Sequence, residues 1–170
     1  MGARRRGRIL AFQTLYAYEL CSLCSLGAQS KRTPQPANSP IEEVLEFPWI
    51  DEPSREKMNQ ESIDFARLIA WGTIQNLTEI DEQIKIQLEH WDFSRLNKVD
   101  QALLRIGVYS LLFQKDIPAS VTIDEAVDIS KEYGTDESYR FINAPSCHNV
   151  VLPARFSGFN DAPSIIFSPK

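Results

Sequence analysis

The residues best suited to chemistry are four arginines near the amino terminus, Arg4, Arg5, Arg6 and Arg8. Guanidinium groups bind phosphate oxygens through paired hydrogen bonds and stack on unpaired bases, which suits single-stranded RNA. The whole chain of 170 residues is acidic, with a formal net charge of −5, so the positive charge is local. This asymmetry favours a small phosphate-binding patch over general coating by nucleic acid. The alternative interpretation is a solvated, poorly ordered arm.

The other candidate ligands and nucleophiles indicate neither a metal site nor an enzyme. Cys21 and Cys24 form a C-x-x-C pair, and Cys147 stands beside His148, so a four-ligand zinc site can be written down. However, the pair continues a helical stripe, with no glycine or charge to shape a loop, so we expect buried, reduced cysteines and no metal. The only other histidine, His90, lacks a recognisable catalytic partner motif. We expect no catalytic residue and no cofactor.

Helical periodicity predicts the elements that position these residues. The most apolar run, Val99 to Phe113, is expected to be the central helix, beginning near Asn97. Arg105 lies within it and must reach carboxylates or carbonyls, or lie along the surface with its stem buried. An earlier amphipathic helix carries the arginines at its start and an apolar stripe of Ile9, Phe12, Tyr16, Leu20 and Leu23.

The remaining segments complete an all-α fold. Residues 25–55 form a proline-rich connection with one docking helical turn, and two helices follow with a break near Thr78, three residues before Asp81. Thr122 and Glu125 predict a capping box, Gly134 a left-handed helix end, and residue 135 a new helix start. No alternation typical of strands is present. No apolar stretch approaches the ~20 residues of a membrane span, so we expect a cytoplasmic protein with no membrane contact.

Several separated motifs, in this order, resemble the NusB family of transcription antitermination factors, over about residues 3–144. They are RRRGRILAFQTLYAYEL, WGTIQN, LNKVDQALLRIGVYSLLF, DIPASVTIDEAVDISKEYG and DESYRFIN. The resemblance implies a non-enzymatic bacterial protein of two small helical bundles. It also implies pairing with the ribosomal small-subunit protein NusE on boxA RNA, where the pair helps the transcription elongation complex through ribosomal RNA operons.

The same resemblance implies the site residues. RNA binding falls to Arg4, Arg5, Arg6, Arg8, Glu137 and Phe141, and the NusE surface includes Tyr16 and Asp100. Physically, Phe141 could stack on a base, and Glu137 or Ser138 could contact a base edge. Without the resemblance, the two aromatic residues fit core packing, and Asp100 fits a first-turn carboxylate favoured by the helix dipole.

The carboxyl end departs from the family pattern. Family members extend the last helix beyond the F-[IV]-N motif, whereas residues 145–170 contain four prolines that forbid one long helix, Pro145, Pro153, Pro163 and Pro169. We therefore predict a helical domain over residues 1–144 and a divergent, poorly ordered tail over 145–170.

Three other functions stay open at this level. The first is a helical scaffold that binds only protein, and the second is an inactive divergent copy. The third is the RNA-binding part of a ribosomal RNA methyltransferase. This last is disfavoured, because the chain leaves no room for a methyl-donor domain and has no glycine-rich loop after a strand.

Overall fold

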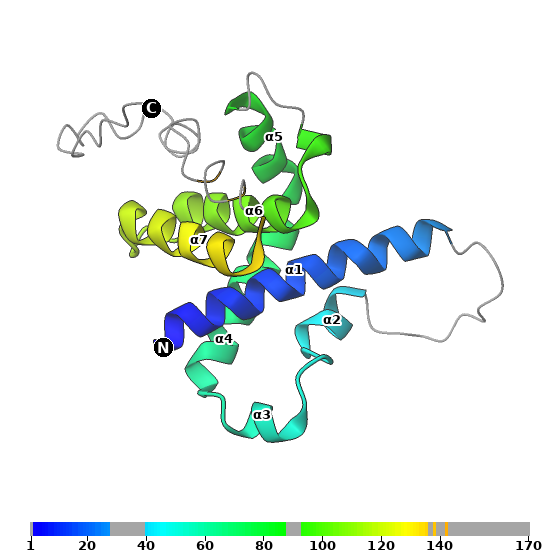
Figure 1. The fold of residues 1–170 in the computed structure, drawn as a ribbon, viewed down its shortest axis with the longest axis vertical. Helices are drawn as coiled ribbons and strands as arrows, with labels where there is room; N and C mark the ends of the chain where they lie inside the picture. The colour runs from blue at the N-terminus through cyan, green and yellow to red at the C-terminus, as the bar shows by residue number, and fades with distance from the viewer. Residues whose placement is uncertain (1, 28–39, 88–92, 136–137, 139–141, 143–170) are drawn as a thin grey trace.

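The computed structural model describes residues 2–27, 40–87, 93–135, 138 and 142, and within them every regular element is helical. The all-α prediction is therefore confirmed (Figure 1). The elements are α1 (Ala3–Gly27), α2 (Pro40–Leu45), α3 (Glu52–Glu56), α4 (Gln60–Gln75), α5 (Leu77–Gln87), a short 3₁₀ helix η1 (Phe93–Arg95), α6 (Lys98–Phe113) and α7 (Ala119–Tyr133). Among the described residues, no helix has the length and apolar character to span a membrane.

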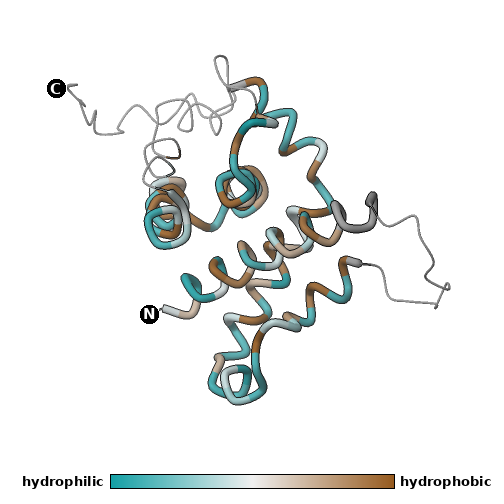
Figure 2. The backbone as a smooth tube through the Cα atoms, turned by 45° about the vertical axis from the view of Figure 1, so that its right-hand side comes forward, coloured by the Kyte–Doolittle hydropathy of each residue, from teal (hydrophilic) through white to brown (hydrophobic). Residues whose placement is uncertain are grey.

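The helices form two small bundles, as the family resemblance implies. In the first, α1 packs along α4, and α2 contacts both. In the second, α7 runs back along α6, and α5 packs against α6 on another side. Hydrophobic and hydrophilic residues are interspersed along the helices (Figure 2), and the long helices α4, α6 and α7 each bury part of their residues. Both α1 and α4 also contact α6, so one continuous core joins the bundles.

The predicted central helix is confirmed as α6. Its apolar residues are buried on several sides, as expected for a helix surrounded by neighbours; they include Ala102, Leu103, Leu104, Ile106 and Val108. Asn97 caps the helix, because its side-chain oxygen accepts a hydrogen bond from the Asp100 backbone N–H at 2.7 Å. Arg105 reaches carboxylates, which was one of the two alternatives for an arginine in so apolar a run.

The structure corrects several predicted helix boundaries. Thr122 does not cap α7, which begins three residues earlier, after Pro118; Thr122 is instead 3% exposed. Gly134 ends α7 in an extended conformation, with φ −90° and ψ −171°, and not in a left-handed one. A glycine is needed there because an added Cβ would lie 2.5 Å from the Ser130 carbonyl oxygen. The predicted helix start at residue 135 is supported, since the Thr135 N–H donates to the Ser138 hydroxyl at 2.9 Å.

The first half of the chain also differs from prediction in detail. The break between the middle helices falls at Asn76, so Thr78 lies inside the first turn of α5 and does not cap it. Within the proline-rich connection, the docking turn is confirmed as α2, whereas α3 was not predicted. The 145–170 tail lies outside the described residues.

Two glycines give opposite predictions for the same substitution. In Gly7→Ala, the new Cβ would lie 2.8 Å from Phe65 Cδ1 and 2.9 Å from the Ser62 carbonyl oxygen, so α1 and α4 must separate. We expect this variant to lose about 1–3 kcal/mol of unfolding free energy. Gly107→Ala in α6 meets no atom within 4 Å and should gain about 0.5–1 kcal/mol from reduced backbone entropy. Urea unfolding of both variants tests this, and equal shifts would contradict it.

Candidate nucleic-acid interface

The helical rotation of about 100° per residue spreads the four arginines around the first turns of α1. Arg4 points toward α4, where its guanidinium carbon lies 4.5 Å from the centre of the Phe65 ring. Its Nε is also 3.6 Å from Glu61 Oε1, and the side chain remains 59% exposed. Arg4 is therefore held by a cation–π contact and a weak surface ion pair, and it stays open to a ligand.

Arg5 points the other way, toward α7. Its guanidinium lies 3.3 Å from Glu125, 3.7 Å from Asp128 and 3.4 Å from Glu132, all measured to carboxylate oxygens. The Arg5 side chain is 22% exposed. We call Glu125, Asp128 and Glu132 the α7 acid row; their spacing of three and four residues places them on one helix face.

Arg6 lies on the side of α1 that faces solvent. It is exposed, and about 200° of helical rotation separates it from both Arg4 and Arg8, so it points away from the packed face. Among the described residues, no ion pair or hydrogen bond engages its guanidinium. Of the four arginines, Arg6 is therefore the one most available to a phosphate.

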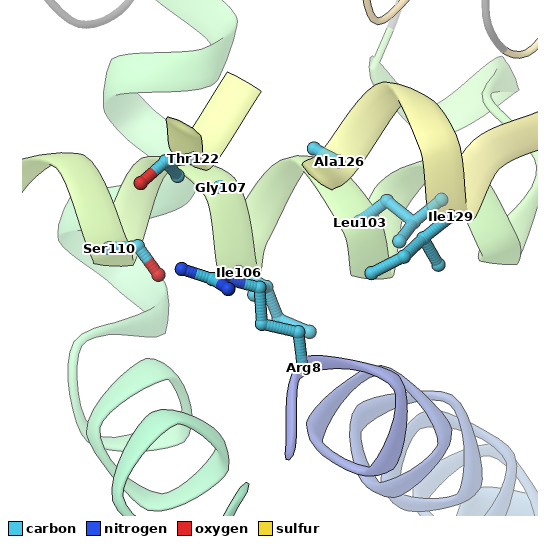
Figure 3. Close-up of a pocket in the computed structure, with 8 residues that line it drawn as sticks. All are labelled: Arg8, Leu103, Ile106, Gly107, Ser110, Thr122, Ala126 and Ile129. Atoms are coloured by element: carbon cyan, nitrogen blue, oxygen red, sulfur yellow. The ribbon is translucent and has the colours of Figure 1, made fainter. Parts of the chain in front are cut away.

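Arg8 differs from its neighbours because it is buried, at 4% exposure. Its guanidinium extends from α1 toward Ser110 in a small cavity between α1, α6 and α7 (Figure 3). Burial lowers the pKa of Arg8, which the charge of Glu125 partly offsets. No described carboxylate forms an ion pair with it, and its Nε has no hydrogen-bond partner. Because α6 and α7 cover its charge, this placement argues against a direct contact between Arg8 and RNA, a role that stays a prediction.

Replacing Arg8 with methionine should separate packing from RNA contact. Methionine keeps an unbranched apolar stem and removes a buried charge, so we expect the free energy of unfolding to stay unchanged or rise by up to about 1 kcal/mol. RNA affinity should stay within about twofold. Arg8→Ala, which also removes the stem, should lose about 2 kcal/mol. Urea unfolding and RNA titration measure both effects, and a large affinity loss in Arg8→Met would restore Arg8 to the interface.

The two predicted partner residues occupy different environments. Tyr16 is half-buried on α1, with its ring centre 6.4 Å from that of Phe12. Asp100 is 6% exposed at the start of α6, where it accepts a hydrogen bond from Asn97 Nδ2 at 2.7 Å. Burial raises the pKa of Asp100, and hydrogen bonds from Ser138 and Asn97 oppose that rise. Asp100 thus has a local structural role in this chain.

The remaining sequence candidates are only partly visible. Glu137 and Phe141 lie outside the described residues, although Ser138 between them is buried at 1% exposure beside Asp100. Cys21 is exposed on α1, which corrects the expectation of burial; Cys24 is helical, but its side chain is not described. The α7 acid row was not predicted from the sequence. Its three- and four-residue spacing along the predicted helix could have indicated an acidic face.

Together these features define an all-helical protein whose first helix begins with a basic, partly exposed surface and contacts helices of both bundles. The NusB family model matches residues 5–144. Transcription antitermination protein NusB of Treponema pallidum (strain Nichols) is 45% identical over 140 residues, which cover 82% of this chain and 86% of that protein. The protein of the same name from Geobacter sp. (strain M21) is 35% identical over 144 residues, covering 84% and 90%. The chain belongs to the NusB family.

Solved structures agree with this assignment. T. maritima NusB, whose structure is solved, is 33% identical to this chain in sequence. The two structures superpose with a TM-score of 0.66, over 87% of this chain and 89% of that one. A chain from a crystal structure of antitermination factors NusB and NusE in complex with dsRNA has a TM-score of 0.64 over 89% and 97% of the two chains. At 24% identity, that second likeness bears on the fold alone.

Proposed function

We propose that this protein is a non-catalytic, RNA-binding transcription antitermination factor of the bacterial cytoplasm. It pairs with a NusE-type ribosomal protein on boxA RNA of ribosomal RNA operons and acts within the transcription elongation complex. The observation that carries the proposal is the exposed arginine surface at the start of α1, in a chain that the NusB family model matches over residues 5–144. The choice of partners is supported by a solved complex of antitermination factors NusB and NusE with dsRNA, one chain of which shares this fold.

The RNA contacts are assigned chiefly to Arg4, Arg5 and Arg6, with Glu137 and Phe141 as further contacts implied by the family. Arginine side chains on a half-exposed helix end contact phosphates and so position the strand, whereas a stacked aromatic ring and a carboxylate contact bases. The partner surface is assigned to the region of Tyr16 and Asp100. Because Asp100 is buried, its contribution is to fix the start of α6 beneath that surface.

Shared binding explains why an acidic protein with few basic contacts can act on RNA. Two weak RNA-binding surfaces that are held together bind as one, since the second contact becomes intramolecular. The α1 arginines supply one surface, and the ribosomal protein supplies the other. The pair should therefore bind boxA RNA more tightly than either protein alone.

The test is fluorescence anisotropy of a labelled boxA-type RNA at two salt concentrations, with and without a NusE-type protein. We expect salt-sensitive binding that the partner strengthens, with a log–log slope of about −0.7 for each phosphate neutralised on a single strand. Binding of the partner without RNA would indicate the protein-only scaffold. Failure to bind either, by a chain whose circular dichroism is helical, would contradict the proposal.

A further inference from the structure

The α7 acid row occupies the same arginine that the proposed function assigns to RNA. Three carboxylates lie within 3.7 Å of the Arg5 guanidinium, and they come from a helix about 120 residues away in the sequence. A phosphate that approaches Arg5 meets these charges at distances well below the Debye length of about 8 Å at physiological salt, so solvent ions screen them weakly. A phosphate that binds Arg5 therefore competes with these carboxylates for its guanidinium.

The members of the acid row are not equivalent. Glu125 is the least exposed, at 25%, and its charge also raises the pKa of the buried Arg8, so it serves both arginines. Asp128 and Glu132 are more exposed, at 55% and 44%, so they are the members of the row most accessible from solvent. Glu125 therefore acts as a structural counter-charge, and the two outer acids, of which Asp128 also pairs with Lys131, are exposed enough to exchange with phosphate.

We propose that Asp128 and Glu132 compete with RNA phosphate for Arg5 and thereby limit the affinity of the isolated protein for RNA. This inference rests on the proposed function. The acids also border the basic surface on its α7 side, so they direct the strand toward Arg4 and Arg6. Weak RNA binding by the isolated protein favours specificity when the partner supplies a second RNA contact. RNA that lacks the partner's site is then released.

The test compares two double variants that raise the net charge equally. Asp128→Asn with Glu132→Gln removes the outer acids of the row. Glu46→Gln with Glu52→Gln is the matched control, since these exposed acids pair with Arg55, and Glu46 also with Arg67, and not with the α1 arginines. Anisotropy titrations use a labelled boxA-type RNA and an unrelated single-stranded RNA, with unfolding curves to confirm folding. The single variant Glu132→Gln provides a milder change if the double variant is unstable.

We expect the acid-row variant to bind both RNAs about three- to tenfold more tightly at low salt. Its log–log salt slope should steepen by up to about 0.7, as for one more neutralised phosphate. The control should change affinity by less than twofold, and adding Arg5→Ala to the acid-row variant should abolish the gain. Equal gains in both double variants, or weaker binding by the acid-row variant, would overturn the inference.

The outcomes also separate this inference from the proposed function. If the native protein binds neither RNA with or without a NusE-type partner, the proposed function fails. The inference then stands only if the acid-row variant gains binding that depends on Arg5, and it is overturned if no such binding is gained.

Discussion

Replacing Arg105 with alanine is expected to lower the free energy of unfolding by about 3–5 kcal/mol, because it breaks a buried charge network. Arg105 Nε and Nη2 donate to the two carboxylate oxygens of Asp81 at 2.7 and 2.8 Å, and Nη1 donates to Glu19. Lys98 Nζ lies 2.9 Å from the second Glu19 oxygen. The Arg105 side chain is 9% exposed, so its removal leaves carboxylates from α1 and α5 in a largely dry site.

Urea unfolding measures this loss, and an exposed ion pair supplies the control. Lys131 lies 3.4 Å from Asp128, and both side chains are 55% exposed. Lys131→Ala should therefore change the unfolding free energy by less than about 0.5 kcal/mol. A comparable loss in the two variants would show that the Arg105 network contributes no more than a surface pair.

The same network gives the expected pH dependence. Burial raises the pKa of Glu19, but hydrogen bonds from Lys98 and Arg105 outweigh it, so the folded pKa lies below the ordinary value of 4.5. The resulting stabilisation is fully present above pH 4.5 and is lost as pH falls through the lower, folded pKa. In Arg105→Ala, this acid-dependent loss should shrink, which unfolding curves between pH 3 and 7 would detect.

The largest expected effect on RNA binding comes from replacing Arg5 and Arg6 together with alanine. We expect about a tenfold loss of affinity for boxA-type RNA, and a salt slope shallower by about 0.7 for the lost Arg6 contact and by up to about 1.4 if Arg5 also contacts a phosphate. Arg6→Ala alone should account for most of the loss, because the acid row already occupies Arg5. Helicity should not change. Anisotropy titrations and circular dichroism measure these quantities.

The control for this variant removes two positive charges elsewhere. Lys57 and Lys115 are exposed and lie outside α1, so Lys57→Ala with Lys115→Ala should change RNA affinity by less than twofold. An Arg5→Ala and Arg6→Ala variant that binds as tightly as the native protein at moderate salt would remove the start of α1 from the RNA-binding surface.

The core helices were predictable because their apolar residues repeat with helical spacing over many turns. The burial of Arg8 was predictable by the same reasoning, since it precedes Phe12 by four residues and Leu15 by seven, and both are buried. The burial of Arg8 was missed because the four arginines were treated as one exposed cluster. The pairing of Arg5 with the acid row was not predictable, because it depends on how α7 packs against α1.

The misplaced helix starts have a different cause. Thr122 and Glu125 have the spacing of a capping box, yet the fixed φ of Pro118 allows α7 to begin one turn earlier. Packing against α6 then buries the Thr122 side chain. Thr78 and Asp81 fail similarly, because Asp81 is used by Arg105 in the tertiary network. Local motifs identify possible starts, and tertiary contacts select among them.

Because α1 is unbroken, it fixes the distance and the relative orientation of the two proposed binding surfaces. Arg5 and Tyr16 are eleven residues apart, which in an unbroken helix is a rise of about 16 Å and a rotation close to three full turns. The two side chains therefore leave the helix in nearly the same direction, the one from which Arg5 reaches α7. One residue inserted between them would move one surface by about 1.5 Å and swing it by about 100°, so RNA and partner could no longer meet on the same side of the molecule.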